Sequence, residues 1–283
     1  MVQKINLVGS GIKHSRMPQL QEYLGKMAGI NISYGKVDGA LDADFNLAGV
    51  VKKSVRENYT GLNITHPYKS AVVSLVTRAI IPEHDQIGSY NTLKFENGEI
   101  LGANTDYSGF VRAYNKYRNQ QSPGKVFLVG AGGVGRAIAF TLATLGCHEL
   151  MIYDRRENQA RVLAKTLEQK GLNACVVTSA NLESAMLSAD GLVNCTEMGM
   201  YNHPGSAIDA KLIGNQQWAF DAVYTPMETE FLSACREAGL LCICGYDLWI
   251  YQGLNAFTIF TGIEIEPDEK LLKTTRNWLD STG

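Results

Sequence analysis

The chain has 283 residues, of which 45% are hydrophobic and 19% charged, and its formal net charge is −2 at pH 7. This length suits two domains with ordinary hydrophobic cores, and the slight acidic excess argues against nucleic-acid binding through phosphate neutralisation. Because no apolar run approaches the roughly 20 residues that span a bilayer, and the N-terminal MVQKINLVGSG lacks a signal peptide's apolar stretch, we expect a cytoplasmic protein without membrane or nucleic-acid partners.

In the N-terminal part, short β-rich runs alternate with a helical stretch, which indicates an α/β fold. The expected strands are 5–8, 32–37, 61–64 and 89–95. Leu20, Leu24 and Met27 recur at helical spacing and predict a helix in this segment. Asn97 and Gly98 predict a hairpin turn, because both residues tolerate a positive φ.

A second series begins after the loop 119–125, whose Ser-Pro-Gly sequence marks a break. The expected strands are 126–130, 150–154, 174–178, 191–196, 218–223 and 240–244, with helices ending near Leu145 and Leu167. This alternation predicts a doubly wound parallel sheet. The apolar helix 247–261 is expected to pack back on the first part. We therefore predict one domain at 1–105, completed by the C-terminal helices 246–283, and a second at 106–245.

The cysteines of the chain are six in number and stand in apolar or strand-like settings. No histidine or second cysteine pair completes the spacing of a zinc site. Cys242 and Cys244 would share one face of a strand. We expect buried, inert thiols and no bound metal.

Gly130, Gly132 and Gly135 form G-x-G-x-x-G where an expected strand ends and a helix begins. The first glycine allows a tight turn, the second lets a pyrophosphate approach the backbone, and the third permits close packing of helix and strand. The helix N-terminus offers unpaired N–H groups to phosphates. The second domain is therefore predicted to be a Rossmann-type NAD(P)-binding domain, although such a loop can also bind another nucleotide or none. Its predicted cofactor contacts are Gly130, Ala131, Gly132, Gly133, Val134 and Gly135.

Asp154 closes the next strand, 22 residues after Gly132. Its carboxylate can accept hydrogen bonds from the adenosine ribose and would repel a 2′-phosphate, which favours NAD. Arg155 and Arg156 favour the opposite choice, because guanidinium groups pair well with phosphate, but they can equally be solvated loop charges. We predict NAD as the preferred cofactor, with NADP as a possible second one.

Three further segments, GLNITHPYK (61–69), GSYNTL (88–93) and GANTDYSGF (102–110), place polar residues after strand ends. Pro67 suits a first helical turn, so Lys69 would feel the positive end of a helix dipole, which lowers a lysine pKa toward the range useful for proton transfer. Asp106 would oppose this shift while fixing the amine. Taken alone, the pattern favours a surface lysine at position 69, and His66 is expected to be a loop histidine without a chemical role.

Together with GAGGVGRAI, NCTEMGM and GYDLWIYQG, these segments resemble, in this order, the signature segments of the shikimate/quinate dehydrogenase family. The resemblance runs from the first strand to about Gly262. Its most specific part is the combination of THPYK (65–69) with NTD (104–106). It implies an NAD(P)-dependent oxidoreductase that transfers a hydride between the cofactor and the alcohol or ketone of shikimate and 3-dehydroshikimate.

The resemblance also implies residue roles. Lys69 and Asp106 would be catalytic, binding the reacting hydroxyl and taking its proton, alone or with water. The implied substrate contacts are Ser15, Thr65, Asn91, Tyr224 and Gln252. The cofactor contacts are extended to Asp154, Arg155, Thr196, Met198, Gly199, Met200 and Gly245. The expected substrate is a small polyhydroxylated carboxylate bound in a cleft between the domains of a monomer or homodimer, with no metal.

Some residues depart from the family pattern. Met17 stands where a second hydroxyl residue is usual, and a thioether cannot donate a hydrogen bond to a carboxylate. Quinate or an amino-substituted relative therefore remains an alternative to shikimate. Glu197 is unexpected so near the cofactor and must be solvated or paired. Asp154-Arg155-Arg156 replaces the Asn-Arg-Thr type of sequence found in NADP-using members.

Two other classes of function stay open at this point. A non-catalytic metabolite sensor could retain the same fold, although the intact Lys69, Asp106 and glycine loop argue against it. A folate-linked dehydrogenase of similar two-domain shape would be expected to carry its lysine in a different local pattern from T-x-P-x-K.

Overall fold

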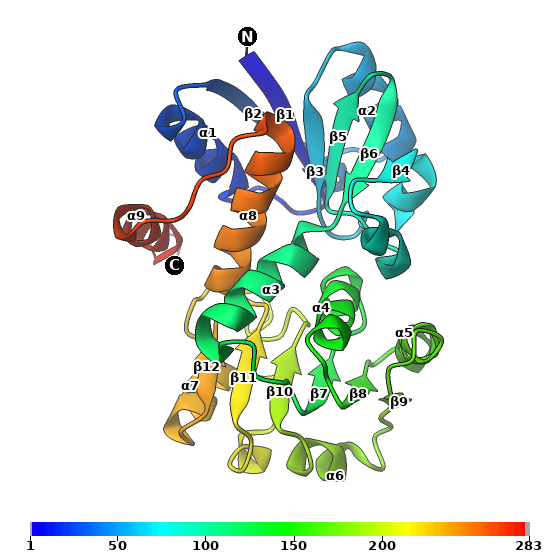
Figure 1. The fold of residues 1–283 in the computed structure, drawn as a ribbon, viewed down its shortest axis with the longest axis vertical. Coiled ribbons are helices and arrows are strands. Elements are labelled where there is room, and N and C mark those ends of the chain that lie inside the picture. The colour runs from blue at the N-terminus through cyan, green and yellow to red at the C-terminus, as the bar shows by residue number, and fades with distance from the viewer. Residues whose placement is uncertain (1, 281–283) are drawn as a thin grey trace. The chain divides into compact units, whose positions relative to one another are not determined.

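The computed structural model describes residues 2–280, which divide into two compact units (Figure 1). Unit 1 contains residues 2–108 and 251–278, and unit 2 is built around residues 109–250. The boundaries at 108/109, 250/251 and 278/279 all fall inside helices, namely α3 (Thr105–Arg118), α8 (Gly245–Thr261) and α9 (Glu269–Asp280). The limits that the sequence suggests for the functional domains, at 105/106 and 245/246, remain predictions.

The sheet of unit 1 is mixed, in the order β2-β1-β3-β5-β6-β4. Its strands are β1 (Val2–Gly9), β2 (Asn31–Asp38), β3 (Gly61–Ile64), β4 (Arg78–Ala79), β5 (Thr92–Glu96) and β6 (Glu99–Ala103). β1 pairs in parallel with β2 and β3, whereas β5 runs antiparallel to both β3 and β6. Asn97 and Gly98 have φ angles of 51° and 79° and join β5 to β6, which confirms the predicted hairpin.

The helical elements of unit 1 are α1 (Met17–Met27), α2 (Leu47–Arg56), α9 (Glu269–Asp280) and the 3₁₀ helices η1 (Gly39–Leu41), η2 (Ala71–Leu75) and η3 (Pro82–Ile87). α1 confirms the helix predicted from the spacing of Leu20, Leu24 and Met27; the two leucines are fully buried, and Met27 at the helix end is 45% exposed. A Cβ on Gly253 of α8 would lie 2.5 Å from the Leu20 side chain. The glycine therefore lets α8 approach α1 closely.

The sheet of unit 2 is parallel throughout, in the order β12-β11-β10-β7-β8-β9. Its strands are β7 (Lys125–Val129), β8 (Glu149–Tyr153), β9 (Ala174–Val176), β10 (Gly191–Asn194), β11 (Trp218–Asp221) and β12 (Leu241–Ile243), and its remaining helical elements are α4 (Gly133–Thr144), α5 (Glu157–Glu168), α6 (Leu182–Leu187), α7 (Glu230–Glu237) and η4 (Ala210–Leu212). The strand order reverses between β7 and β10, where a doubly wound sheet binds its ligands. The predicted α/β fold with a Rossmann-type domain is confirmed.

The strands of the unit 2 sheet are apolar because their side chains lie in the protein core. Phe127, Leu192 and Trp218, on three neighbouring strands, are completely buried. The Trp218 indole N–H donates to the Pro123 carbonyl at 3.1 Å. Gly191 is required beside it, because a Cβ there would lie 2.3 Å from the indole ring.

All six cysteines are free thiols, but the expectation that they are buried holds fully for only two of them. Cys147 and Cys235 are buried as expected, whereas Cys195, Cys242 and Cys244 are only partly buried, the last two packed against one core cluster. Cys175 is exposed, because β9 is the edge strand of its sheet and this residue faces solvent. Within residues 2–280 no group of three His, Cys, Asp or Glu side chains could hold a metal ion, and each helix there is too short or too polar to cross a bilayer.

Candidate active site

Lys69 and Asp106 form a short ion pair in unit 1, with 2.6 Å between Lys69 Nζ and Asp106 Oδ2. Lys69 lies in the turn after β3, and Asp106 lies in the first turn of α3. Their side chains are only 11% and 7% exposed. Charges withdrawn from water to this degree need a partner, since an isolated buried charge is strongly destabilising. The structure thus brings together the two side chains that the sequence marked as catalytic.

The local structure before Lys69 differs from the expectation. The prediction of a helix that begins at Pro67 is wrong. This segment is a turn, in which the Tyr68 N–H donates to the Thr65 carbonyl and the His66–Pro67 peptide is cis. The 3₁₀ helix η2 begins only at Ala71. Proline fits a turn as well as a first helical turn, so the local pattern could not separate them. Because no helix begins at Pro67, the expectation that a helix dipole acts on Lys69 from there has no structural basis. His66 itself is exposed, as expected for a loop histidine.

Asn91 and Gln252, two of the predicted substrate contacts, meet at Thr105. Asn91 Oδ1 accepts the Thr105 N–H at 2.7 Å, and the Thr105 hydroxyl lies 3.1 Å from Asn91 Oδ1 and 3.3 Å from Gln252 Oε1. Asn91 and Thr105 are 4% and 1% exposed. The Asn91 amide nitrogen has no hydrogen-bond partner within residues 2–280, so it can serve a ligand. This cluster directly precedes Asp106 along the chain.

Ser15 and Thr65, the remaining predicted contacts in unit 1, are both half-buried. The Thr65 N–H donates to the Val8 carbonyl at 2.9 Å, which fixes it at the end of β1. Ser15 Oγ accepts the Met17 N–H at 3.3 Å. No hydrogen bond among the described residues joins Ser15 or Thr65 to Lys69 or Asp106.

Met17, the departure from the family pattern, is a core residue. It is 6% exposed, and its sulfur lies 3.6 Å from Gln21 Nε2. A Cβ on Gly253 would lie 3.5 Å from the end of the Met17 side chain. The thioether therefore fills space between α1 and α8.

The glycine loop of unit 2 has the geometry that its spacing predicts. Gly130 has a φ of 98°, and a Cβ there would lie 2.8 Å from the Cys195 backbone. A Cβ on Gly135 would lie only 1.8 Å from the Gly130 carbonyl oxygen. Gly132, by contrast, has no atom within 4 Å of its Cβ position. The loop is thus open to a ligand at Gly132, directly before the first turn of α4, where Gly133 and Val134 begin the helix.

Asp154 holds this loop in place. Its Oδ2 accepts the Ala131 N–H at 2.8 Å, and its Oδ1 accepts the Arg156 N–H at 2.8 Å. A carboxylate has about four lone-pair sites, so each oxygen can still accept from a ribose hydroxyl. Arg155 and Arg156 are exposed and form no ion pair with any residue in the described part of the chain.

The NCTEMGM segment is organised by two buried polar residues that the sequence reasoning did not select, Asn194 and Asp221. Asn194 Oδ1 accepts the Thr196 hydroxyl at 2.7 Å, and its Nδ2 donates to the Met198 carbonyl at 3.1 Å and to Asp221 Oδ1 at 2.9 Å. Both residues are completely buried. The sequence feature that could have identified them is a polar residue at the end of an apolar strand, as in GLVN (191–194) and WAFD (218–221).

Burial raises the pKa of Asp221 to about 6. Hydrogen bonds from the Thr229 hydroxyl at 2.6 Å and from the Val223 N–H at 3.0 Å oppose this rise, as does the bond from Asn194.

The remaining residues of this segment lie in a tight turn. Gly199 has a φ of 106°, which only glycine adopts without strain. Its N–H donates to the His203 carbonyl at 2.8 Å, and Met200 forms an isolated bridge with His203. Glu197 is solvated, because its side chain is 59% exposed, and its carboxylate lies 3.6 Å from His203 Nε2. The requirement stated for Glu197 is therefore met.

Tyr224 and Gly245 also belong to unit 2. Tyr224 stacks on Trp249, with 6.1 Å between ring centroids, and burial raises its pKa. Gly245 begins α8, and a Cβ there would lie 2.3 Å from the Val223 carbonyl oxygen. Gly245 thus provides a close backbone approach, a role independent of any cofactor.

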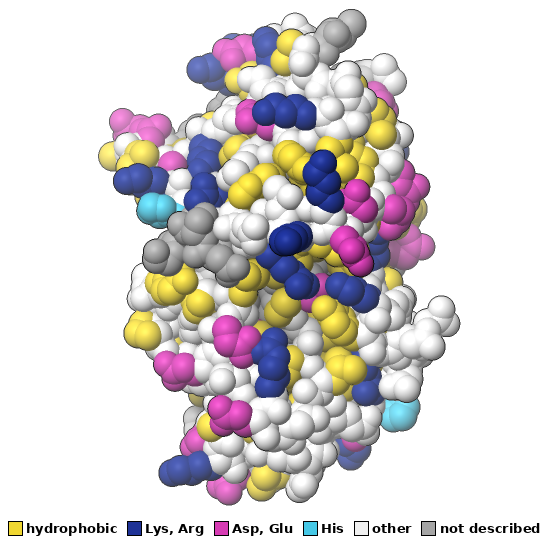
Figure 2. Space-filling view, turned by 90° about the vertical axis from the view of Figure 1, so that its left-hand side faces the viewer, with side chains coloured by type: hydrophobic (Ala, Val, Ile, Leu, Met, Phe, Trp, Pro, Cys, Tyr) yellow, Lys and Arg dark blue, Asp and Glu magenta, His cyan; other side chains and the backbone are white. Residues whose placement is uncertain are grey.

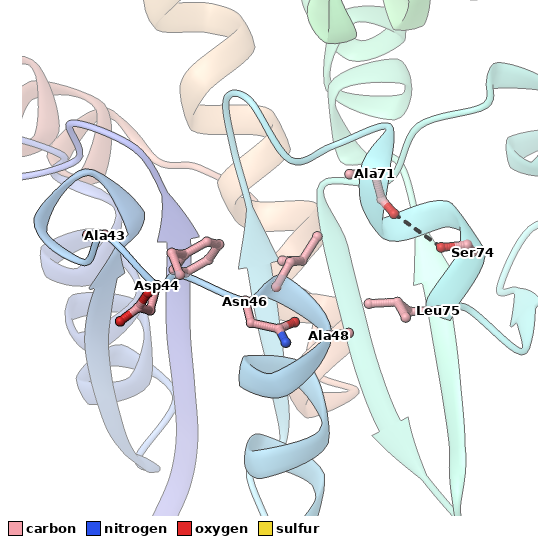
Figure 3. A pocket seen from close by; sticks show the side chains of 9 residues that line it. Ala43, Asp44, Asn46, Ala48, Ala71, Ser74 and Leu75 are labelled. Atoms are coloured by element: carbon pink, nitrogen blue, oxygen red, sulfur yellow. Dashed lines mark hydrogen bonds between the residues drawn. The ribbon is translucent and has the colours of Figure 1, made fainter.

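A cavity of about 530 Å³ lies elsewhere in unit 1, between the segment leading into α2 and the 3₁₀ helix η2 (Figure 3). None of the predicted site residues lines it. Two of its polar side chains form hydrogen bonds with nearby backbone groups: Asn46 Oδ1 accepts the Gly49 N–H, and Ser74 Oγ donates to the Ala71 carbonyl. On the face drawn in Figure 2, basic and acidic side chains are interspersed.

The chain resembles known proteins over almost its whole length. Residues 7–93 match the shikimate dehydrogenase substrate-binding domain, and residues 113–203 match the shikimate/quinate 5-dehydrogenase family. A quinate/shikimate dehydrogenase (NAD⁺) of Corynebacterium glutamicum is 36% identical over 96% of either chain. A shikimate dehydrogenase (NADP⁺) of an Arthrobacter strain is 33% identical over 93% of this chain and 91% of that protein.

Solved structures agree with the sequence matches. Quinate dehydrogenase from Corynebacterium glutamicum in complex with NAD has a TM-score of 0.89 and 34% identity, covering 99% of this chain and all of that one. Shikimate 5-dehydrogenase from Thermus thermophilus with NADP(H) and shikimate has a TM-score of 0.84 and 31% identity, covering 98% and 99% of the two chains. This protein belongs to the shikimate/quinate dehydrogenase family.

Proposed function

We propose that this protein transfers a hydride between NAD(P) and the ring alcohol of shikimate, or alternatively of quinate. The observation that carries the proposal is the shielded Lys69–Asp106 ion pair of 2.6 Å. It lies next to the cluster of Asn91, Thr105 and Gln252, in which the Asn91 amide nitrogen has no hydrogen-bond partner within residues 2–280 and is available to a ligand. The curated relatives named above support the same reaction type.

Lys69 and Asp106 divide the proton chemistry between them. A lysine ammonium carries three N–H donors. Asp106 accepts one of them and thereby fixes the direction of the amine, which leaves the others for the substrate hydroxyl. In the oxidation direction the Lys69 ammonium first releases one proton to water, and the neutral amine then takes the hydroxyl proton as the hydride leaves. In the reduction direction the ammonium donates a proton to the oxygen. Asn91, Thr65 and Gln252 bind the other hydroxyls, and Ser15 binds the carboxylate.

The glycine loop fits a dinucleotide, since Gly132 leaves its Cβ position open at the N-terminus of α4. We assign the pyrophosphate to the loop 130–135, the ribose to Asp154 and Arg155, and the nicotinamide end to Thr196, Met198, Gly199 and Met200. Gly245 and Tyr224 would complete the cofactor and substrate contacts of unit 2. The dinucleotide, when bound, supplies the hydride acceptor or donor.

NAD is proposed as the preferred cofactor and NADP as a second, weaker one. The Asp154 carboxylate would repel a 2′-phosphate, while its free lone pairs suit ribose hydroxyls. Arg155 and Arg156, which are exposed and form no ion pair with any of residues 2–280, offer a 2′-phosphate some compensation. The Corynebacterium relative carries NAD⁺ in its name and the Arthrobacter relative NADP⁺.

The proposal also covers the setting of the enzyme: a monomer or homodimer in the cytoplasm, without nucleic-acid or membrane partners. Six free thiols fit a reducing compartment.

The test is a panel of kcat/KM values for shikimate and quinate with NAD and with NADP, followed by the near-ultraviolet absorbance of the reduced nicotinamide. We expect turnover of at least one substrate, with NAD ahead of NADP. Binding of both substrate and cofactor without any reduction would overturn the enzyme assignment and favour a metabolite sensor on the same fold. Higher kcat/KM for quinate would assign the substrate to the alternative.

A further inference from the structure

His84 differs from the other histidines of the chain. It is 1% exposed, in the 3₁₀ helix η3, whereas His14, His66, His148 and His203 are exposed. Its sequence, PEHDQ, consists of polar residues and proline. A buried polar ring needs a hydrogen-bonding partner, so the contacts of His84 require an explanation.

The partner of His84 is the backbone of the catalytic segment. The Asn104 N–H donates to His84 Nδ1 at 3.0 Å. A backbone N–H can only donate, so Nδ1 must carry a lone pair, and the proton of the neutral ring lies on Nε2. Nε2 is buried and has no hydrogen-bond partner within residues 2–280. The ring is therefore oriented by its Nδ1 bond and by the edge contact with Tyr107, at 5.2 Å between centroids.

This bond is one of several that fasten the start of α3. The Asn104 side chain accepts the Tyr107 N–H at 3.1 Å and donates to the Ser89 carbonyl at 2.9 Å. Thr105 donates its N–H to Asn91 Oδ1. Each of the two residues before Asp106 is thus held by a buried acceptor, and His84 supplies the acceptor for Asn104.

We propose that His84 is a positioning residue for the reaction: by accepting the Asn104 N–H it fixes where α3 begins, and thereby where the Asp106 carboxylate meets Lys69. The inference rests on the proposed function, because it assigns His84 to the chemistry of that pair. His84 does not touch substrate or cofactor in this role.

The surroundings keep the ring neutral. Burial lowers the pKa of His84, against the opposing effect of the neighbouring carboxylates Glu83 and Asp85, which raise it. The titratable side chain of α3 that contacts the ring is Tyr107. A neutral ring is the form that the Asn104 bond requires.

Two substitutions separate the hydrogen bond from simple packing. His84→Leu fills much of the same space but has no acceptor. His84→Asn carries its Oδ1 on the same atom as the histidine Nδ1 and can accept the Asn104 N–H. Ile87→Ala is the control, because Ile87 is fully buried in the same 3₁₀ helix and its truncation disturbs packing without removing this acceptor.

We expect His84→Leu to lower kcat on the order of tenfold to a hundredfold, since a 1 Å misplacement can cost about a hundredfold, with the KM for NAD unchanged. His84→Asn should recover most of that kcat, and Ile87→Ala should lower the melting temperature without a comparable loss of kcat. If His84→Leu does not fold, His84→Gln replaces it in the experiment, because the glutamine amide lies at the position of the histidine Nε2 and leaves no acceptor at the Nδ1 position. Wild-type kcat in the variant without the acceptor, or no recovery in His84→Asn, would overturn the proposal.

A second measurement does not depend on activity. Nitrogen-15 NMR of the imidazole should show His84 as the neutral tautomer protonated at Nε2. A ring protonated at Nδ1 would contradict the hydrogen bond and the proposal with it. A wild-type protein without turnover would instead remove the proposed function, while the tautomer would still decide whether His84 holds Asn104.

Discussion

The Lys69 ammonium and the Asp106 carboxylate lie 2.6 Å apart, and each is the ion-pair partner of the other in a region where both side chains are nearly inaccessible. We predict that Lys69→Ala and Asp106→Asn each lower kcat at least a hundredfold, the lower end of what a general acid or base contributes, roughly 10²–10⁴-fold. The affinity for NAD should be unchanged, because the predicted cofactor residues belong to unit 2.

The measurement for this prediction combines steady-state kinetics with a cofactor titration. Lys53→Ala is the matched control, because it removes a lysine from an exposed ion pair with Glu57, and exposed pairs contribute little. Near-normal turnover in either Lys69→Ala or Asp106→Asn would remove the catalytic assignment.

Two glycines of the same loop should respond in opposite ways to alanine. Gly132→Ala should fold normally but bind NAD more weakly, because its Cβ would occupy space open to the pyrophosphate. Gly135→Ala should destabilise unit 2, because its Cβ would lie 1.8 Å from the Gly130 carbonyl oxygen. Thermal unfolding and an NAD titration of both variants check this. Equal stability of the two variants would contradict the assignment.

Met17→Ser should not improve substrate binding, although it restores a hydroxyl. Met17 is buried between α1 and α8, and truncating such a side chain costs about 2–5 kcal/mol. We expect a lower melting temperature and no decrease in KM for shikimate or quinate. A KM reduced tenfold or more, as a new bond to a carboxylate would give at about 1.5–3 kcal/mol, would show that the site can accept the hydroxyl.

Asp221 should make stability depend on pH in the direction opposite to most carboxylates. Its pKa is raised from 3.8 to about 6 in the folded state, so the folded protein keeps a proton that the unfolded chain has already released. The contribution is therefore favourable below pH 4 and is lost as the pH rises to 6, a change of about 3 kcal/mol. Unfolding of the wild type and of Asp221→Asn should diverge by that amount between pH 4 and pH 7, with the wild type relatively less stable at pH 7. A constant difference would refute the shift.

The sequence predicts local features of this protein well. The strands, the hairpin at Asn97-Gly98 and the glycine loop depend on side-chain alternation, on φ and on missing Cβ atoms, and these are properties of neighbouring residues. The turn at Pro67 was missed because proline satisfies two local structures. Cys175 was misjudged because only the strand order reveals β9 as an edge.

Contacts between distant segments could not be predicted from local patterns. The proximity of Lys69 and Asp106, 37 residues apart, was expected only through the family resemblance. His84 gave no signal at all, because PEHDQ has the composition of an exposed loop and its acceptor role depends on Asn104, 20 residues away. Asn194 and Asp221 likewise acquire their roles only when β10 and β11 lie side by side.

The orientation of the Asn91 amide has a consequence for the choice of ligand. Its oxygen accepts from Thr105, whereas its amino group has no hydrogen-bond partner within residues 2–280, and an ammonium at Lys69, of the proposed catalytic pair, would likewise offer only donors. A ligand atom held by either group must bring lone pairs, as an alcohol or a ketone does. A protonated amine brings none, so neither of these two groups could hold it, and of the catalytic pair proposed above only the Asp106 carboxylate could accept from it.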